Sequence, residues 1–120
     1  MPKPLLTCRN ESRGTVLGDK IRKADNYFTR LLGLLPKKSL APGEGLWIVP
    51  CKDIHSVGMK FLFDAVFLDK KGLVVHLIES MPPMKLGAFI KTAHTVVELP
   101  AGTIADSQTQ LGDQITVSPN

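Results

Sequence analysis

The chain has 120 residues, of which 43% are hydrophobic and 22% are charged, and its formal net charge is +4. This composition is typical of a globular protein, and a domain of this length buries roughly two-thirds of its unfolded surface. We therefore expect one domain over residues 1–120. Every apolar run is shorter than the roughly 18 residues that a membrane-spanning helix needs, which predicts no membrane span.

The first residues and the cysteine content predict a cytoplasmic protein. Arg9 and Glu11 lie too close to the start for the apolar core of a secretory signal peptide. Export followed by removal of a leader is the alternative. The two cysteines, Cys8 and Cys51, are typical of reduced thiols and not of a disulfide framework.

Positive charge is concentrated in the first third of the chain. Residues 1–40 contain nine Lys or Arg and three acidic residues, whereas residues 41–120 contain six and eight. A basic segment can bind nucleic acid or another acidic surface. Tyr27 and Phe28 are the aromatic residues of this segment, and they do not form stacking positions interleaved with the charges. A solvated helix face therefore explains the charges better, and nucleic acid is disfavoured as a partner.

Short apolar segments separated by Gly and Pro predict about seven strands. They cover residues 5–9, 15–23, 46–50, 63–69, 73–80, 93–99 and 114–118. A turn at residues 11–14 joins the first two. Gly72 supplies the positive φ that a tight hairpin needs between the fourth and fifth.

A single helix is predicted near residues 25–35. Its apolar positions recur at i, i+3, i+4 and i+7, at Phe28, Leu31, Leu32 and Leu35. Asp25 or Asn26 can cap its start, and Pro36 ends it. One further helical turn is expected within residues 103–110. The fold class is therefore mainly β, a small sandwich or closed barrel with the helix against one edge.

Near-continuous apolar strands predict burial on both faces. The expected core comprises Leu32, Leu46, Ile48, Val66, Leu68, Val75, Leu77, Val97 and Leu99.

Residues 51–69, CKDIHSVGMKFLFDAVFLD, resemble the signature of the family known as domain of unknown function 192. Residues 30–34, 45–51, 96–102 and 111–113 are also similar to the motifs of that family, in the same order. The resemblance covers residues 24–117. It implies a small mainly-β domain without an assigned activity, cofactor or catalytic residue.

Polar and reactive residues gather where this run enters its strand. The candidate binding residues are Cys51, His55, Ser56, Gly58, Met59 and Asp64, with Asp64 at the floor of a surface depression. The leading hypothesis is a non-catalytic domain that binds a protein partner or a small ligand through residues 55–61. The sequence indicates neither the identity of this partner nor an oligomeric state.

Two further hypotheses belong to other functional classes. A small hydrolase or lyase would use Cys51, His55 and Asp64, with the Gly58 amide as an oxyanion donor. A nucleic-acid or acidic-surface binder would use the basic residues 1–40.

Metal and cofactor sites are not predicted. Cys51, His55, His76 and His94 lack the close paired spacing of zinc ligands. The chain contains no dinucleotide-binding, phosphate-loop or zinc-protease motif.

Two acidic residues interrupt apolar strands, and their burial requires a partner. These residues are Asp64 and Glu98. Arg30 on the predicted helix can satisfy a carboxylate with two charge-assisted hydrogen bonds. We expect a structural ion pair between Arg30 and Glu98, or between Arg30 and Asp64, that fastens the helix to the sheet.

Overall fold

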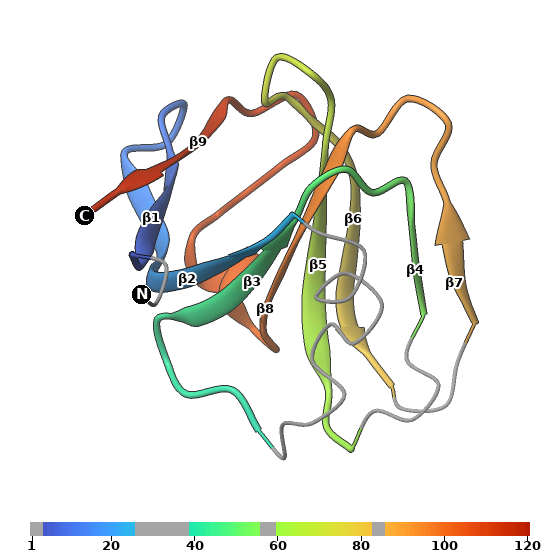
Figure 1. Cartoon of the computed structure of the whole chain (residues 1–120), viewed down its shortest axis with the longest axis horizontal. Helices are drawn as coiled ribbons and strands as arrows, with labels where there is room; N and C mark the ends of the chain where they lie inside the picture. Colours follow the sequence, from blue (N-terminus) through green and yellow to red (C-terminus); the bar gives the residue numbers. More distant parts are fainter. Residues whose placement is uncertain (1–3, 26–38, 56–59, 83–85) are drawn as a thin grey trace.

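The computed structural model describes residues 4–25, 39–55, 60–82 and 86–120, and Figure 1 shows a mainly-β domain. Within these residues, seven strands form one sheet in the order β6-β5-β8-β3-β2-β1-β9. They are β1 (Leu6–Asn10), β2 (Thr15–Ala24), β3 (Glu44–Ile48), β5 (Phe63–Leu68), β6 (Val74–Met81), β8 (Thr95–Pro100) and β9 (Ile115–Pro119). Neighbouring strands are antiparallel except β2 and β3, which are parallel.

The sheet curls into a half-barrel whose two edge strands approach each other at one end. An isolated bridge pairs Leu73, just before β6, with Gln114, just before β9. Gly72 makes the tight turn between β5 and β6 possible, because its φ of 83° lies in the left-handed region that glycine tolerates. The short helix α2 (Thr103–Asp106) and the turns after it run between β8 and β9.

Side chains alternate between the two faces of the sheet, and this alternation creates two hydrophobic clusters. Val66 and Leu68 of β5 belong to the interior cluster, whereas Phe63, Ala65 and Phe67 belong to the outer cluster. The rest of the buried interior cluster is Leu6, Cys8, Leu17, Ile21, Val74, Val97, Leu99, Ile104 and Ile115. Both faces of β5 are therefore buried, as its continuous apolar sequence predicts.

A two-stranded ribbon lies beside the half-barrel, away from β1 and β9 in Figure 1. It consists of β4 (Asp53–His55) and β7 (Leu86–Phe89), which pair antiparallel. Ile54 points inward and joins the outer cluster. A Cβ at Gly87 would lie 1.8 Å from the Ile54 carbonyl oxygen, so only glycine allows the two strands to approach this closely.

The structure confirms the mainly-β fold class and each of the seven predicted strands. The helical turn within 103–110 is α2, and the turn at 11–14 is also present. The strands β4 and β7 were not predicted, because segments of three and four residues carry too little periodicity. The helix predicted near residues 25–35 lies, from residue 26 onward, outside the described residues, and so does Leu32.

Most of the predicted core positions are buried. Ile48, Val66, Leu68, Val97 and Leu99 are at most 6% exposed. Leu46, Val75 and Leu77 are only half-buried, at the margins of the two clusters. In the part of the chain that the structure describes, no helix has the length and apolar character needed to cross a membrane.

Candidate functional site

The predicted binding face is described only in part. Cys51 is half-buried; its amide donates to the His94 carbonyl (2.8 Å), and its thiol donates to the Asp53 carbonyl (2.8 Å). His55 ends β4 and pairs with Leu86 of β7. Ser56, Gly58 and Met59 lie outside the described residues. The site formed by residues 55–61 therefore stays a prediction.

Asp64 lies on the interior face of β5 and is completely buried. Its Oδ1 accepts a hydrogen bond from the Ser80 amide, and its Oδ2 accepts one from the Ile104 amide, both at 2.8 Å. The Ile104 amide belongs to the first turn of α2, so the Asp64 side chain on strand β5 caps the start of this helix. Backbone amides thus supply the partners that a buried carboxylate requires.

Cys51 and Asp64 are not brought together. Cys51 packs against the outer cluster, whereas Asp64 points to the interior side of the same sheet. Both Asp64 oxygens are already bound by amides. Cys51 and Asp64 therefore lie on opposite sides of the sheet, and the part of His55 in the hydrolase hypothesis stays a prediction.

Glu98 occupies the opposite face of the sheet. It follows the alternation of β8, in which Val96 joins the outer cluster and Val97 the interior one, and it pairs with Ala65 of β5. Its side chain is 5% exposed, and among the described residues no donor reaches Oε1. Burial raises the pKa of this carboxyl from 4.5 to about 8, which favours the neutral acid at pH 7. Arg30 lies outside the described residues, so the ion pair stays a prediction.

The structure describes the side chains of two histidines, His76 and His94. His76 of β6 contacts Phe67 edge to face, with ring centroids 5.3 Å apart at 75°. His94 precedes β8, and its amide donates to the Leu68 carbonyl at 2.7 Å. Among the described residues, no three Cys, His, Asp or Glu side chains are arranged to hold a metal ion.

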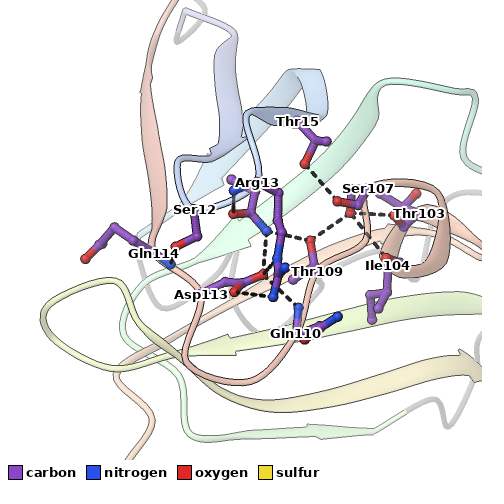
Figure 2. A network of polar contacts seen from close by, with 11 residues as sticks. Ser12, Arg13, Thr15, Thr103, Ile104, Ser107, Thr109, Gln110, Asp113 and Gln114 are labelled. Carbon is purple, nitrogen blue, oxygen red and sulfur yellow. Dashed lines mark hydrogen bonds and ion pairs between the residues drawn. The ribbon is translucent and has the colours of Figure 1, made fainter.

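A network of polar side chains, all buried except that of Arg13, lies between the β1–β2 turn and the segment that follows α2 (Figure 2). We call it the polar cluster: Asn10, Arg13, Ser107, Thr109 and Asp113. The Arg13 guanidinium donates to both Asp113 oxygens, from Nε at 3.1 Å and from Nη2 at 3.2 Å. Asn10 Nδ2 donates to Asp113 Oδ2 (2.9 Å) and Thr109 Oγ1 (3.1 Å).

The polar cluster keeps Asp113 charged. The hydrogen bond from Arg13 is the main cause that lowers the pKa of Asp113 from 3.8 to about 2, with further hydrogen bonds from Asn10 and the Gln110 amide. Sequence reasoning missed this cluster, because its partners are about one hundred positions apart. The available signals were a polar turn at residues 11–14 and the Gly112-Asp113 turn.

A shallow depression of about 430 Å³ lies beside the polar cluster. Arg13 and Glu79 provide its charged groups, and Leu77 and Ile104 provide apolar surface. Its remaining lining residues are Ala105, Gln108, Thr109 and Gln110.

The ribbon carries the most exposed large apolar side chain among the described residues. Phe89 of β7 is 68% exposed, and it pairs with Asp53 of β4. Leu62, which immediately precedes β5, is 48% exposed. Leu111 in the turn before β9 is similarly exposed, at 65%, but it lies beside the polar cluster residue Asp113 and not on the ribbon.

Comparison with known proteins places this chain in one family. The sequence profile of DUF192, described as "Uncharacterized ACR", matches residues 8–117. The chain belongs to the DUF192 family. A relative from Pyrococcus furiosus, UPF0127 protein PF1050, is 28% identical over 112 residues, which are 88% of this chain and 93% of the relative.

Two crystal structures share the fold of this DUF192 domain. A protein of unknown function from Novosphingobium aromaticivorans superposes with a TM-score of 0.77 at 19% identity, covering 92% of this chain and 82% of that one. A Sinorhizobium meliloti protein, provisionally described as a transcription regulator, gives 0.79 at 20% identity, covering 93% and 91%. At these identities the likeness establishes the fold and no activity.

Proposed function

We propose that this DUF192 domain is a non-catalytic binding module, and that it binds a protein partner through the β4–β7 ribbon and the adjoining residues 55–61. The observation that carries this proposal is the exposure of Phe89, an aromatic side chain on the outer face of a two-stranded ribbon. Buried aromatic residues supply much of the binding energy at protein interfaces. An aromatic side chain held in water on a rigid strand is therefore a candidate anchor.

The rigidity of the ribbon supports this role. Ile54 fixes its inner face to the outer cluster, and Gly87 packs directly against the Ile54 carbonyl. The ammonium group of Lys52 donates to the carbonyls of Lys91 and Ala93, at 3.0 and 2.6 Å. A partner would therefore meet a preformed surface and would not have to order it on binding.

The surroundings of Phe89 indicate the chemistry of the partner. Exposed Lys52 directly precedes β4 and exposed Lys91 follows β7, Lys60 belongs to residues 55–61, and Asp53 is the acidic side chain of β4. In the described part of the chain, β7 pairs with β4 alone, so its other edge is open to strand addition. We propose an extended acidic segment with an apolar side chain that covers Phe89.

This proposal can be tested with peptides selected from a random display library on the immobilised wild-type domain. We expect an apolar residue flanked by Asp or Glu to recur among them. Phe89→Ala should weaken peptide binding by at least about tenfold, as expected for loss of an interface anchor. Leu111→Ala is the matched control, because Leu111 is equally exposed elsewhere on the surface. Equal affinity of wild type and Phe89→Ala would refute the proposal.

The part of His55 requires a separate experiment. If His55 belongs to the binding face, His55→Ala weakens peptide binding and leaves the thermal unfolding temperature unchanged. If His55 instead satisfies a buried carbonyl, the same change lowers the unfolding temperature. Measuring affinity and unfolding on one variant distinguishes the two roles.

A further inference from the structure

We infer that the depression beside the polar cluster is a second site, one that binds a zwitterionic α-amino acid with an apolar side chain. Arg13 is the cation of its lining and Glu79 is the anion. Leu77 and Ile104 provide apolar surface. An α-amino acid presents a carboxylate, an ammonium group and a side chain within one small molecule. The depression offers a counterpart to each of these groups.

Arg13 is prepared to receive the carboxylate. Asp113 accepts from its Nε and its Nη2, which fixes the plane of the guanidinium (Figure 2). A guanidinium has five N–H donors, so three remain for a ligand. Asn10 and the Gln110 amide hold Asp113 in turn, through hydrogen bonds of 2.9 Å to Oδ2. The entropic cost of ordering the arginine side chain is therefore met by the fold and not by ligand binding.

Glu79 is the natural partner for the ammonium group. It is exposed on β6, and within the described residues neither Arg13 nor another cation forms an ion pair with it. Because Asp113 already neutralises much of the Arg13 charge, and because Glu79 lines the same depression, a simple anion would gain little here. A zwitterion satisfies both charges.

Backbone strain also marks this depression. Among the described residues, only Ser80 and Gln108 combine a side chain with a positive φ, 51° and 58° respectively. Gln108 lines the depression, and Ser80 directly follows Glu79, which also lines it. Strained backbone conformations concentrate at functional sites, since elsewhere they are removed without loss of function.

The experiment is isothermal titration, with chemical-shift mapping, of the full chain with L-leucine and L-phenylalanine. N-acetyl-L-leucine, which lacks the ammonium group, and L-leucinamide, which lacks the carboxylate, are the matched probes. We expect a Kd of about 1 mM or tighter for at least one amino acid, and binding at least about tenfold weaker for both derivatives of leucine relative to leucine itself. No binding of either amino acid at about 10 mM, or equal binding of N-acetyl-leucine and leucine, would overturn the inference.

Three variants connect the binding to this depression. Glu79→Gln lies outside the polar cluster and should remove the preference for leucine over N-acetyl-leucine. Ala105→Trp fills the depression from an exposed helix position and should abolish binding, whereas Ala101→Trp, at an exposed position lining a different depression, should leave it intact. Unchanged binding by Ala105→Trp with normal unfolding would overturn the assignment of the site.

Discussion

Asp64 on the interior face of β5 and Asp113 in the turn before β9 are buried, and each of their carboxylate oxygens accepts a hydrogen bond. On the outer face of the same sheet, Glu98 is equally buried, and Oε1 has no donor among the described residues. The donors to both carboxylates thus come from distant segments of the chain. The outer face contains a carboxyl group that burial drives toward the neutral form.

This difference separates the residues that hold the fold together from the residues that are available for binding. Hydrogen-bonded polar groups fix α2 and the two turns of the polar cluster in one position. Among these groups, the remaining N–H donors of Arg13 are the ones available to a partner. The outer face also holds the ribbon and the exposed Phe89. An exposed aromatic side chain is costly, so Phe89 indicates where binding has been favoured over stability. Buried atoms without a partner do not make this distinction, because among the described residues they include Trp47 Nε1 at the interior cluster as well as Glu98 Oε1.

The largest expected effect comes from Asp64→Ala. It leaves the Ser80 and Ile104 amides without an acceptor in a buried site, and the free energy of unfolding should fall by about 2–6 kcal/mol. Urea unfolding measures this change. Asp69→Ala is the matched control, because Asp69 also accepts two amides, from Lys71 and Leu73, but is half-exposed and water can replace it. Equal losses would remove the distinction made for the interior.

Asp113→Asn should have a smaller effect, about 1–3 kcal/mol at pH 7. The carboxamide keeps one accepting oxygen but places an NH2 group opposite the Nη2 donor of Arg13, and it removes the negative charge. The pKa of Asp113 is lowered from 3.8 to about 2 on folding. Its contribution to stability is therefore complete above pH 4 and is lost as the pH falls toward 2. Thermal unfolding between pH 2 and 7 should show that the variant lacks this part of the acid dependence. An identical acid profile would refute the assignment.

The fold was predictable from the sequence to the extent that it depends on local patterns. The apolar strand at 63–69 and the turn at Gly72 can each be predicted from a few neighbouring residues. The ribbon is different, since β4 and β7 become strands only by pairing with each other across more than thirty residues. Tertiary contact, not local propensity, determines such short strands.

The candidate sites were less predictable for the same reason. The sequence indicates that Asp64 and Glu98 interrupt apolar strands and need an explanation. It cannot indicate that backbone amides satisfy Asp64, because these amides come from positions 80 and 104. Likewise, Asn10 and Asp113 meet only because β1 pairs with β9. The ion pair of Arg30 stays a prediction.

Glu98→Gln provides a test with the opposite sign. The pKa of Glu98 is raised from 4.5 to about 8 on folding, so its contribution to stability is complete below pH 4.5 and is lost as the pH rises through 8. Glutamine imitates the neutral acid and does not ionise. The variant should match wild type near pH 4.5 and exceed it by several kcal/mol at pH 8, measured by urea unfolding, because each unit of pKa shift corresponds to about 1.4 kcal/mol. If the substitution instead lowers the free energy of unfolding by about 3 kcal/mol, Glu98 is ionised and forms an ion pair with a cation such as Arg30.

The smallest effect concerns the rates at which the two cysteine thiols react. One thiol lies in the interior cluster and the other at the outer cluster, so their rates compare the two sides of the sheet. Cys8 is fully buried in the interior cluster, and burial raises the pKa of its thiol from 9.0 to about 12. Cys51 is half-buried at the outer cluster. Because the thiolate is the reactive species, a disulfide reagent should modify Cys51 at least about tenfold faster than Cys8 in the folded protein. Cys8 should react only as fast as the chain unfolds. Rates measured on Cys8→Ala and Cys51→Ala assign each phase, and rapid modification of Cys8 in Cys51→Ala under native conditions would show that the interior opens locally.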